Sequence, residues 1–381
     1  MVVQIKIRNG VTSFKSLMTV LAATLGVGNI VGVAAAIAIG GIGSVFWIFV
    51  SGVFAIATKY VETYVVLKYR KQDKQGYYGG AMYVLRDRLG CKNLAILFSV
   101  FVIIASFGGN MIQSNAMAES IIETFHVNPY FLATVVTILS FYVIFGNEKR
   151  TANISSILVP VATILYMGMC CYLLYLFRDN LWASVVAITK EALSFKAGIG
   201  GIFGSLAIRA MNAGLSKGLY SNEAGMGSSP LFNATVKGDK SIKEESIISS
   251  TSVFIDTVVL CSITGLILVA SGLTGTIENP ITLTNAVFGM IPYGKYMLSF
   301  SLAIFAIATI PCWGYYGSIG IRYLFHGKNF YPFVYKVVYG SCVFIGALAT
   351  VQTVWSISSI ANALMIFPNL YMIYALRKEV E

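Results

Sequence analysis

Long apolar stretches separated by short polar connectors repeat along the whole chain. A run of about 20 apolar residues is the length of helix that crosses a bilayer. Segments of about ten residues with alternating polarity, which predict a transmembrane β-barrel, are not seen in the sequence. The pattern predicts an all-α integral membrane protein with about ten transmembrane helices, at 14–38, 43–69, 93–124, 129–146, 152–177, 197–236, 246–271, 296–325, 332–350 and 353–376. Residues 181–193 are predicted to form a helix on the outer surface.

The predicted helices fall into two blocks of five with the same rhythm of broken, long and tilted spans. The span at 197–236 is too long for one continuous helix at about 1.5 Å per residue, so part of it is non-helical. Gly26-Val-Gly-Asn29 in the first block is matched by Gly225-Met-Gly-Ser228 in the second. Because five is odd, the second block has the opposite orientation in the membrane. We therefore expect one transmembrane domain with a leucine-transporter-type 5+5 inverted repeat, 1–178 and 179–381, and broken first and sixth helices.

Charge is scarce and lies mainly on one side of the predicted membrane. Only 11% of the residues are charged, whereas soluble domains carry about a quarter. The net charge is +11, and most of the 27 lysines and arginines fall in the loops at 70–92, 146–151, 237–245 and 322–336. These loops are every second connection, as the positive-inside rule requires. We therefore expect a multi-pass protein of the cell (inner or plasma) membrane with both termini cytoplasmic, and no nucleic-acid partner.

A glycine-rich break, Leu25-Gly-Val-Gly-Asn-Ile30, lies in the middle of the first apolar stretch. An interrupted helix in hydrocarbon leaves peptide groups unpaired unless they line a cavity. Freed N–H groups at the start of the second half-helix suit a substrate carboxylate. Freed carbonyls near Thr24 and Gly26 suit a sodium ion or an ammonium group. The alternative is close helix packing through small residues, since Gly28 and Gly32 also fit a Gly-x-x-x-Gly pattern.

The segment from Gly218 to Pro230 is the densest polar stretch inside a predicted span. Asn222 and Glu223 are costly in lipid unless they face a cavity or a partner. Arg209 and Lys217 are the candidate ion-pair partners of Glu223. The alternative is a cytoplasmic loop between two shorter helices.

Two other spans carry candidate site residues. In 93–124, Asn110, Gln113 and Ser114 share one helix face, which presents amide groups either to an amino acid or to neighbouring helices. In 296–325, Thr309 is a candidate cation ligand, and Trp313 either closes an apolar pocket or simply packs.

Further charges lie inside predicted spans, among them Lys59, Glu62, Glu119 and Asp256. Lys59 and Glu62 are at i and i+3 and are expected to pair. Asp256 has no local partner, so it is the better candidate for a cation or proton role, although a structural hydrogen bond also accounts for such a residue.

Six motifs, in this order along the chain, resemble the alanine/glycine:cation symporter (sodium:alanine symporter) family. They are Gly26-Val-Gly-Asn-Ile-Val-Gly-Val33, Ala57-Thr-Lys-Tyr-Val-Glu62, Gly79-Gly-Ala-Met-Tyr83, Gly218-Leu-Tyr-Ser-Asn-Glu-Ala-Gly-Met-Gly-Ser-Ser-Pro230, Phe254-Ile-Asp-Thr257 and Trp313-Gly-Tyr-Tyr-Gly317. The resemblance implies uptake of alanine or glycine coupled to Na⁺ or H⁺, with no other cofactor. The candidate substrate-binding residues are then Gly26, Gly28, Asn29, Gln113, Phe203, Asn222 and Trp313. The candidate cation-binding residues are Thr24, Gly26 and Thr309.

The chain departs from the family pattern at two points. Family members usually carry an extra helix ahead of the glycine-rich segment, and this chain starts almost directly at that segment. Thr309 is preceded by Ala308 rather than by a second hydroxyl residue. The sequence is therefore consistent with a sodium site that has fewer hydroxyl ligands and also with coupling to protons.

The leading hypothesis is a secondary active symporter that works by alternating access, with a small neutral amino acid, Na⁺ and the lipid bilayer as its partners. The alternative is a transport-inactive sensor or assembly subunit that retains the fold. No obligatory protein partner is expected. No nucleophile–base pair or metal-ligand set is visible, so no catalytic residue is assigned and the chain is not expected to be an enzyme.

Overall fold

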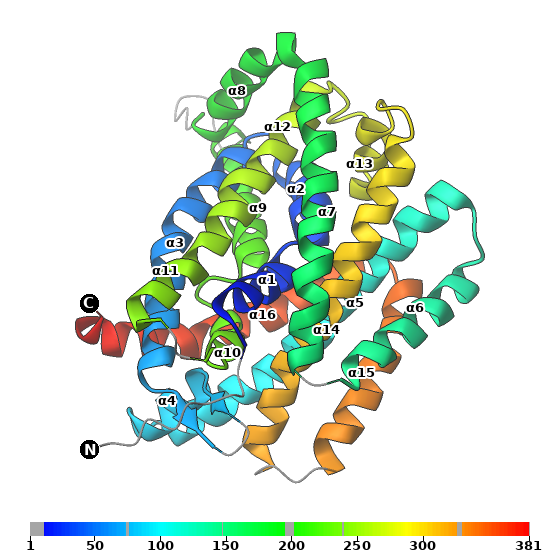
Figure 1. Cartoon of the computed structure of the whole chain (residues 1–381). Coiled ribbons are helices and arrows are strands. Elements are labelled where there is room, and N and C mark those ends of the chain that lie inside the picture. Colours follow the sequence, from blue (N-terminus) through cyan, green and yellow to red (C-terminus); the bar gives the residue numbers. More distant parts are fainter. Residues whose placement is uncertain are drawn as a thin grey trace.

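The computed structural model describes residues 11–73, 76–146, 148–194, 202–237, 240–325 and 330–380. Nearly every described element is a helix (Figure 1). The long helices of the first half are α3 (Ser44–Lys68), α5 (Lys92–Phe125), α6 (Pro129–Ile144) and α7 (Glu148–Leu176). Those of the second half are α11 (Ile242–Val253), which continues through the π-helix η1 (Phe254–Cys261) into α12 (Ser262–Ala270), then α14 (Gly294–Leu324), α15 (Phe330–Leu348) and α16 (Val351–Leu376), which ends in η2 (Arg377–Glu379).

Both predicted helix breaks are present. The first apolar stretch divides into α1 (Ser13–Thr24) and α2 (Val27–Gly40). The sixth divides into α9 (Ile202–Asn222) and the short α10 (Ser229–Asn233). Among the described residues, eight helical segments are long and apolar enough to cross a membrane, counting α1 and α2 as one, and α6 is a shorter apolar helix. Together with α9–α10 they correspond to the ten predicted spans.

The predicted connectors hold more structure than their composition indicates. The 70–92 connector contains the two-residue strands β1 (Lys71–Gln72) and β2 (Tyr77–Tyr78), paired antiparallel, and α4 (Ala81–Asp87). A further helix, α13 (Pro280–Phe288), lies between α12 and α14. The helix expected at 181–193 is α8 (Arg178–Ala192). The elements that were not predicted, β1, β2, α4 and α13, are too short for a periodic pattern in the sequence to reveal them.

Spans of the first half pack against spans of the second. The central helix α5 contacts α14, α15 and α16, while α2 and α3 both contact α9. Helix α1 lies against α7 and α14. This intercalation places both broken helices in the interior, where residues from distant parts of the sequence surround them (Figure 1).

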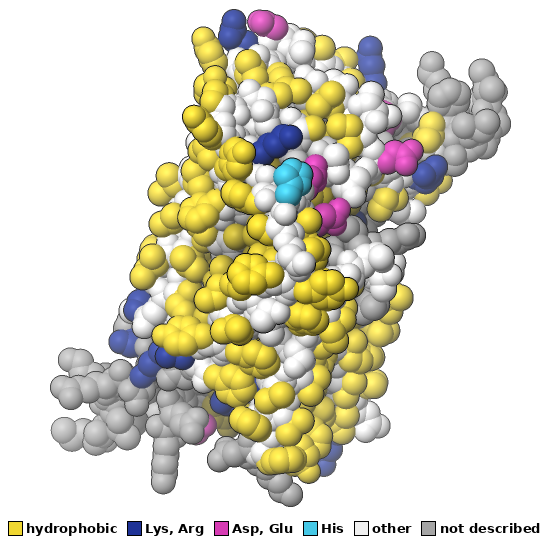
Figure 2. Space-filling view, turned by 90° about the vertical axis from the view of Figure 1, so that its right-hand side faces the viewer, with side chains coloured by type: hydrophobic (Ala, Val, Ile, Leu, Met, Phe, Trp, Pro, Cys, Tyr) yellow, Lys and Arg dark blue, Asp and Glu magenta, His cyan; other side chains and the backbone are white. Residues whose placement is uncertain are grey.

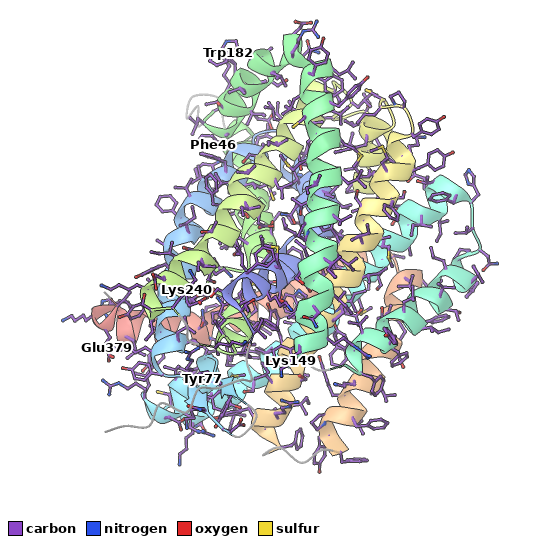
Figure 3. All side chains as sticks on the ribbon, viewed as in Figure 1. Phe46, Tyr77, Lys149, Trp182, Lys240 and Glu379 are labelled. Carbon is purple, nitrogen blue, oxygen red and sulfur yellow. The ribbon has the colours of Figure 1, made fainter. Side chains whose placement is uncertain are left out.

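The surface is apolar where a membrane protein meets lipid. Large hydrophobic side chains such as Phe54, Ile164 and Phe367 are each 73% exposed. Figure 2 shows a face dominated by hydrophobic side chains, with Lys and Arg mostly toward its ends. Trp182 on α8 lies at one end, whereas Tyr77 and Lys149 lie in the opposite half (Figure 3). The chain is therefore a multi-pass membrane protein, and the cytoplasmic location of its basic end stays a prediction.

Candidate functional site

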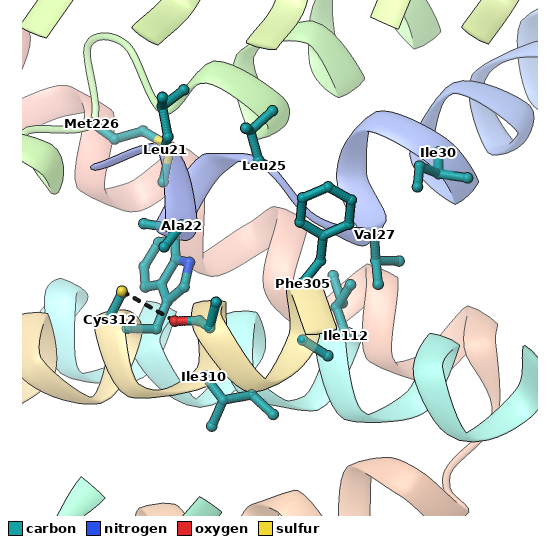
Figure 4. Packing of buried hydrophobic residues seen from close by; sticks show 14 of the residues in the cluster. Leu21, Ala22, Leu25, Val27, Ile30, Ile112, Met226, Phe305, Ile310 and Cys312 are labelled. Atoms are coloured by element: carbon teal, nitrogen blue, oxygen red, sulfur yellow. Dashed lines mark hydrogen bonds between the residues drawn. The ribbon is translucent and has the colours of Figure 1, made fainter. Parts of the chain in front are cut away.

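The first break frees two peptide N–H groups, and neutral amide side chains occupy both. The N–H of Gly26 donates to Asn29 Oδ1 at 3.0 Å. The N–H of Val27 donates to Gln113 Oε1, on α5, at 3.3 Å. Figure 4 shows the narrow connection between Leu25 and Val27, with side chains of α5 and α14 beneath it. Amide oxygens are uncharged acceptors, so a carboxylate that reached these N–H groups would bind them more strongly.

The carbonyl side of the same break meets Thr309 of α14. The Thr309 hydroxyl lies 2.5 Å from the carbonyl oxygen of Ala22, 3.4 Å from that of Leu25 and 2.8 Å from that of Phe305 in its own helix. The hydroxyl has one proton to donate, so these oxygens cannot all be satisfied by it at once. The Gly26 N–H, which would bond the Ala22 carbonyl in a continuous helix, is turned to Asn29 instead. The buried oxygens therefore outnumber the hydrogen-bond donors available to them, and such a group of oxygens suits a cation.

A metal ion at this group would meet carbonyl and hydroxyl oxygens rather than carboxylates. Among the described residues, no cluster of three or more His, Cys, Asp or Glu side chains could hold one. The Thr24 hydroxyl lies 3.5 Å from the Leu21 carbonyl of its own helix, and its role as a cation ligand stays a prediction.

The three polar residues predicted to share one face of α5 make different contacts. Gln113 reaches the first break. Asn110 instead donates to the carbonyl of Tyr339 on α15 at 2.7 Å, and the Ser114 hydroxyl donates to carbonyls of its own helix. Only Gln113 is thus brought to the break, and the alternative of an inter-helix contact holds for Asn110.

Glycines let aromatic residues approach the break closely. A Cβ atom on Gly28 would lie 3.3 Å from the ring of Tyr220. A Cβ atom on Gly109, on α5, would lie 2.9 Å from the indole of Trp313. Trp313 is only 2% exposed and packs edge-on against Tyr316. Aromatic rings therefore pack closely against α2 at Gly28 and against α5 at Gly109. The side chain of Phe203 lies outside the described residues.

Asp256 joins the two breaks. The Asn29 amide donates to the Asp256 carboxylate and, at 3.2 Å, to its main-chain carbonyl. Ser221, near the end of α9, and Thr257 donate to Asp256 Oδ2 at 2.9 and 2.7 Å. Asp256 lies in η1, and π-helical turns are frequent at functional sites. The expectation that Asp256 lacks a local partner is wrong, since the hydroxyl of the very next residue binds it.

The second break is a true turn rather than a continuous helix. Glu223, Gly225 and Gly227 have φ of +53°, +80° and +71°, values that glycine tolerates best. Asn222 Oδ1 accepts the N–H of Ala224 at 3.0 Å. Its Nδ2 is buried and has no hydrogen-bond partner among the described residues, so Asn222 has a donor to offer.

The charges around the second break pair differently from the prediction. Glu223 accepts from the hydroxyls of Ser228 at 2.6 Å and Ser229 at 3.4 Å. Lys217 instead stacks over the ring of Trp355 at 3.7 Å. Arg209 donates to the carbonyl of Ile39 at 3.1 Å. Among the described residues, neither Lys217 nor Arg209 forms an ion pair with Glu223, because each makes its contact elsewhere.

The expected pair of Lys59 and Glu62 is confirmed. Lys59 Nζ lies 3.4 Å from Glu62 Oε1, and both side chains are fully buried. The sequence did not reveal that Asn369, on α16, also binds Glu62. Asn369 is one of two asparagines in the apolar span 353–376, and its polarity there was the only signal for it. The carbonyls of Ala22 and Leu25 have no side-chain signature at all.

Comparison with known proteins agrees with this arrangement. The model that describes the sodium:alanine symporter family matches residues 2–381. The sodium/alanine symporter AgcS of Methanococcus maripaludis is 36% identical over 94% of this chain and 80% of its own length. An uncharacterized transporter of Haemophilus influenzae is also 36% identical, over 98% of this chain and 83% of its own. The probable sodium/glutamine symporter GlnT of Bacillus subtilis is 30% identical, over 98% and 78%.

Solved structures show the fold. MhsT, determined in complex with L-phenylalanine, superposes with a TM-score of 0.66 at 14% identity, covering 97% of this chain and 90% of its own. A Na⁺-coupled sialic acid symporter gives a TM-score of 0.58 at 14% identity, covering 94% and 75%. Both are transporters of the leucine-transporter fold, so the fold expected from the sequence is confirmed.

Proposed function

This chain belongs to the sodium:alanine symporter family, and we propose that it imports alanine or glycine together with Na⁺ by alternating access. One observation carries the proposal. At the first break, two freed N–H groups and a group of oxygens with few hydrogen-bond donors lie within a few residues of each other along the chain. An amino-acid zwitterion and a sodium ion require those two kinds of partner.

The N–H groups of Gly26 and Val27 are the proposed carboxylate site. A substrate carboxylate would replace the amide oxygens of Asn29 and Gln113 there, and the positive end of α2 adds to the attraction. Since charge-assisted hydrogen bonds are stronger than neutral ones, the exchange favours the bound state. Asn29 and Gln113 are then free to turn their amides toward the substrate. Asn222, with its unpaired Nδ2, is the third candidate polar contact.

We expect the rings of Tyr220 and Trp313 to select substrates by the size of their side chains. Gly28 and Gly109 are in close contact with the rings of Tyr220 and Trp313. A larger side chain would have to displace those rings, so a methyl group or a hydrogen fits best. The names of relatives include a sodium/alanine and a probable sodium/glutamine symporter. Preference among neutral amino acids is therefore the first property to measure.

The proposed sodium ligands are the carbonyl oxygens of Ala22 and Leu25 and the hydroxyl oxygen of Thr309. These oxygens connect the end of α1 to α14, so sodium binding favours this arrangement over one in which the two helices separate. Thr309 is the only hydroxyl residue of the pair Ala308–Thr309. Asp256, held by Asn29 and Ser221, is the second position at which a cation or a proton would bind.

Purified protein in proteoliposomes tests the proposal. Uptake of labelled alanine and glycine is measured with sodium and proton gradients imposed separately, and glutamine is compared at equal concentration. We expect uptake of alanine or glycine that exceeds that of glutamine and requires the inward sodium gradient. Uptake driven by the proton gradient alone would show that the coupling ion is a proton rather than sodium. No gradient-dependent uptake of any of the three would contradict symport and favour the transport-inactive sensor.

A further inference from the structure

The two breaks differ in what pairs with their freed N–H groups. At the second break the partner is a carboxylate of the protein itself. Glu62 Oε2, on α3, accepts the N–H of Gly225 at 3.0 Å and that of Gly227 at 3.1 Å. Asn369 donates to the same oxygen at 2.9 Å and also to the carbonyl of Gly225 at 2.9 Å. The three side-chain and backbone donors surround one oxygen atom that is sealed from solvent.

A neighbouring lysine balances the negative charge of the Glu62 carboxylate. Lys59 lies one helical turn before Glu62, and its ammonium contacts Glu62 Oε1 at 3.4 Å. The same ammonium donates to the hydroxyl of Ser229, at the start of α10, at 2.8 Å. A buried carboxylate remains ionised only if it is paired and hydrogen-bonded, and both conditions are met here. Lys59 and Glu62 together thus bind the turn at Gly225 and Gly227 and the start of α10 at Ser229.

The backbone of the turn is shaped for an anion. Gly225 and Gly227 both have positive φ, and N–H groups of a turn in such conformations form a concavity that binds anions. A Cβ atom on Gly227 would lie 2.5 Å from Asn369 Oδ1. The concavity is therefore closed on one side by α16 and filled from the other by Glu62.

We propose that Glu62 is a positioning residue that serves as a built-in anion for the second break. It holds residues 223–228 in the turn that follows Ser221, whose hydroxyl binds Asp256 and so connects the second break with the first. It also occupies the place that an external carboxylate would otherwise take. A substrate carboxylate is thereby left with the first break alone, where only neutral amides must be displaced.

Hydrogen–deuterium exchange of the purified full-length protein tests this without substrate, sodium or transport, so its failure would leave the proposed symport untouched. Peptides that cover 223–228 are compared with peptides that cover 25–29. Glu62→Ala is expected to speed exchange in 223–228 by about tenfold or more and to leave 25–29 unchanged. Glu119→Ala is the matched control, since Glu119 is a half-buried glutamate that binds only a side-chain amide, that of Asn279. It is expected to change neither region.

Anion rescue separates a built-in anion from a merely structural side chain. Potassium formate is expected to slow exchange at 223–228 in Glu62→Ala but not in the wild type, whereas potassium sulfate at equal ionic strength has no such effect because sulfate is too large. Unchanged exchange at 223–228 in Glu62→Ala, or equal effects of formate on both proteins, would overturn the proposal.

If Glu62→Ala is not recovered as a folded protein, Glu62→Gln answers the question. Its amide oxygen can still accept both N–H bonds but carries no charge. Exchange at 223–228 is then expected to be faster than in the wild type while 25–29 is unchanged. Identical exchange in the two proteins would show that the charge of Glu62 does not matter there.

Discussion

Replacing Thr309 by valine removes one hydroxyl and preserves the shape of the side chain. In the structure this hydroxyl contacts carbonyls of α1 at 2.5 and 3.4 Å. If it is a sodium ligand, its loss removes an oxygen dipole from the ion. Hydrogen bonds to charged groups contribute about 1.5–3 kcal/mol, and we take that range for the ion–hydroxyl contact. Because about 1.4 kcal/mol is tenfold, half-maximal uptake should need roughly 10- to 150-fold more sodium.

The assay is labelled alanine uptake into proteoliposomes as a function of external sodium. Thr284→Val is the matched control, because Thr284 is equally buried but donates only to carbonyls of its own helix, at 2.8 and 3.1 Å. We expect Thr284→Val to keep the wild-type sodium dependence and Thr309→Ser to stay close to it. An unchanged sodium dependence in Thr309→Val would refute the assignment of Thr309.

Three further substitutions test other parts of the site. Asn29→Ala removes the amide that is proposed to turn toward the substrate, and uptake should fall at least tenfold through a higher KM for substrate; unchanged uptake would remove Asn29 from the site. Gly227→Ala forces a Cβ atom into a positive-φ position that costs about 1–2 kcal/mol and into contact with an amide oxygen at 2.5 Å. Gly90→Ala has similar φ but open space around it, so its melting temperature in detergent should fall less, and an equal fall would count against the close contact. Lys59→Met alone should cost about 3–5 kcal/mol by leaving a buried charge unpaired, whereas Lys59→Met with Glu62→Gln should cost less; additive losses in thermal unfolding would speak against the buried pair.

The positions of the breaks could be predicted from the sequence because glycine and asparagine stand out inside an apolar stretch. The same holds for Lys59 and Glu62, which are neighbours on one helix face. Helix type and length are local properties, so the ten spans were also accessible. The inverted relation of 1–178 and 179–381 stays a prediction.

Contacts between distant spans were not accessible in this way. Glu62 binds Gly225 and Gly227, and Asn29 binds Asp256, across separations that no periodic pattern encodes. Asn110 and Gln113 share a face by spacing, yet three residues turn the helix by about 300°, and the remaining angle was enough to send them to different neighbours. A main-chain carbonyl such as that of Ala22, here a proposed sodium ligand, becomes available wherever a helix ends. The side chain at that position gives no indication of it.

A structure determined with alanine and sodium bound tests the central claim most directly. We predict the substrate carboxylate at the N–H groups of Gly26 and Val27, the cation between Thr309 and the carbonyls of α1, and Glu62 still bound to Gly225 and Gly227. A carboxylate of the substrate at Gly225 and Gly227, with Glu62 displaced, would contradict the division of roles between the two breaks.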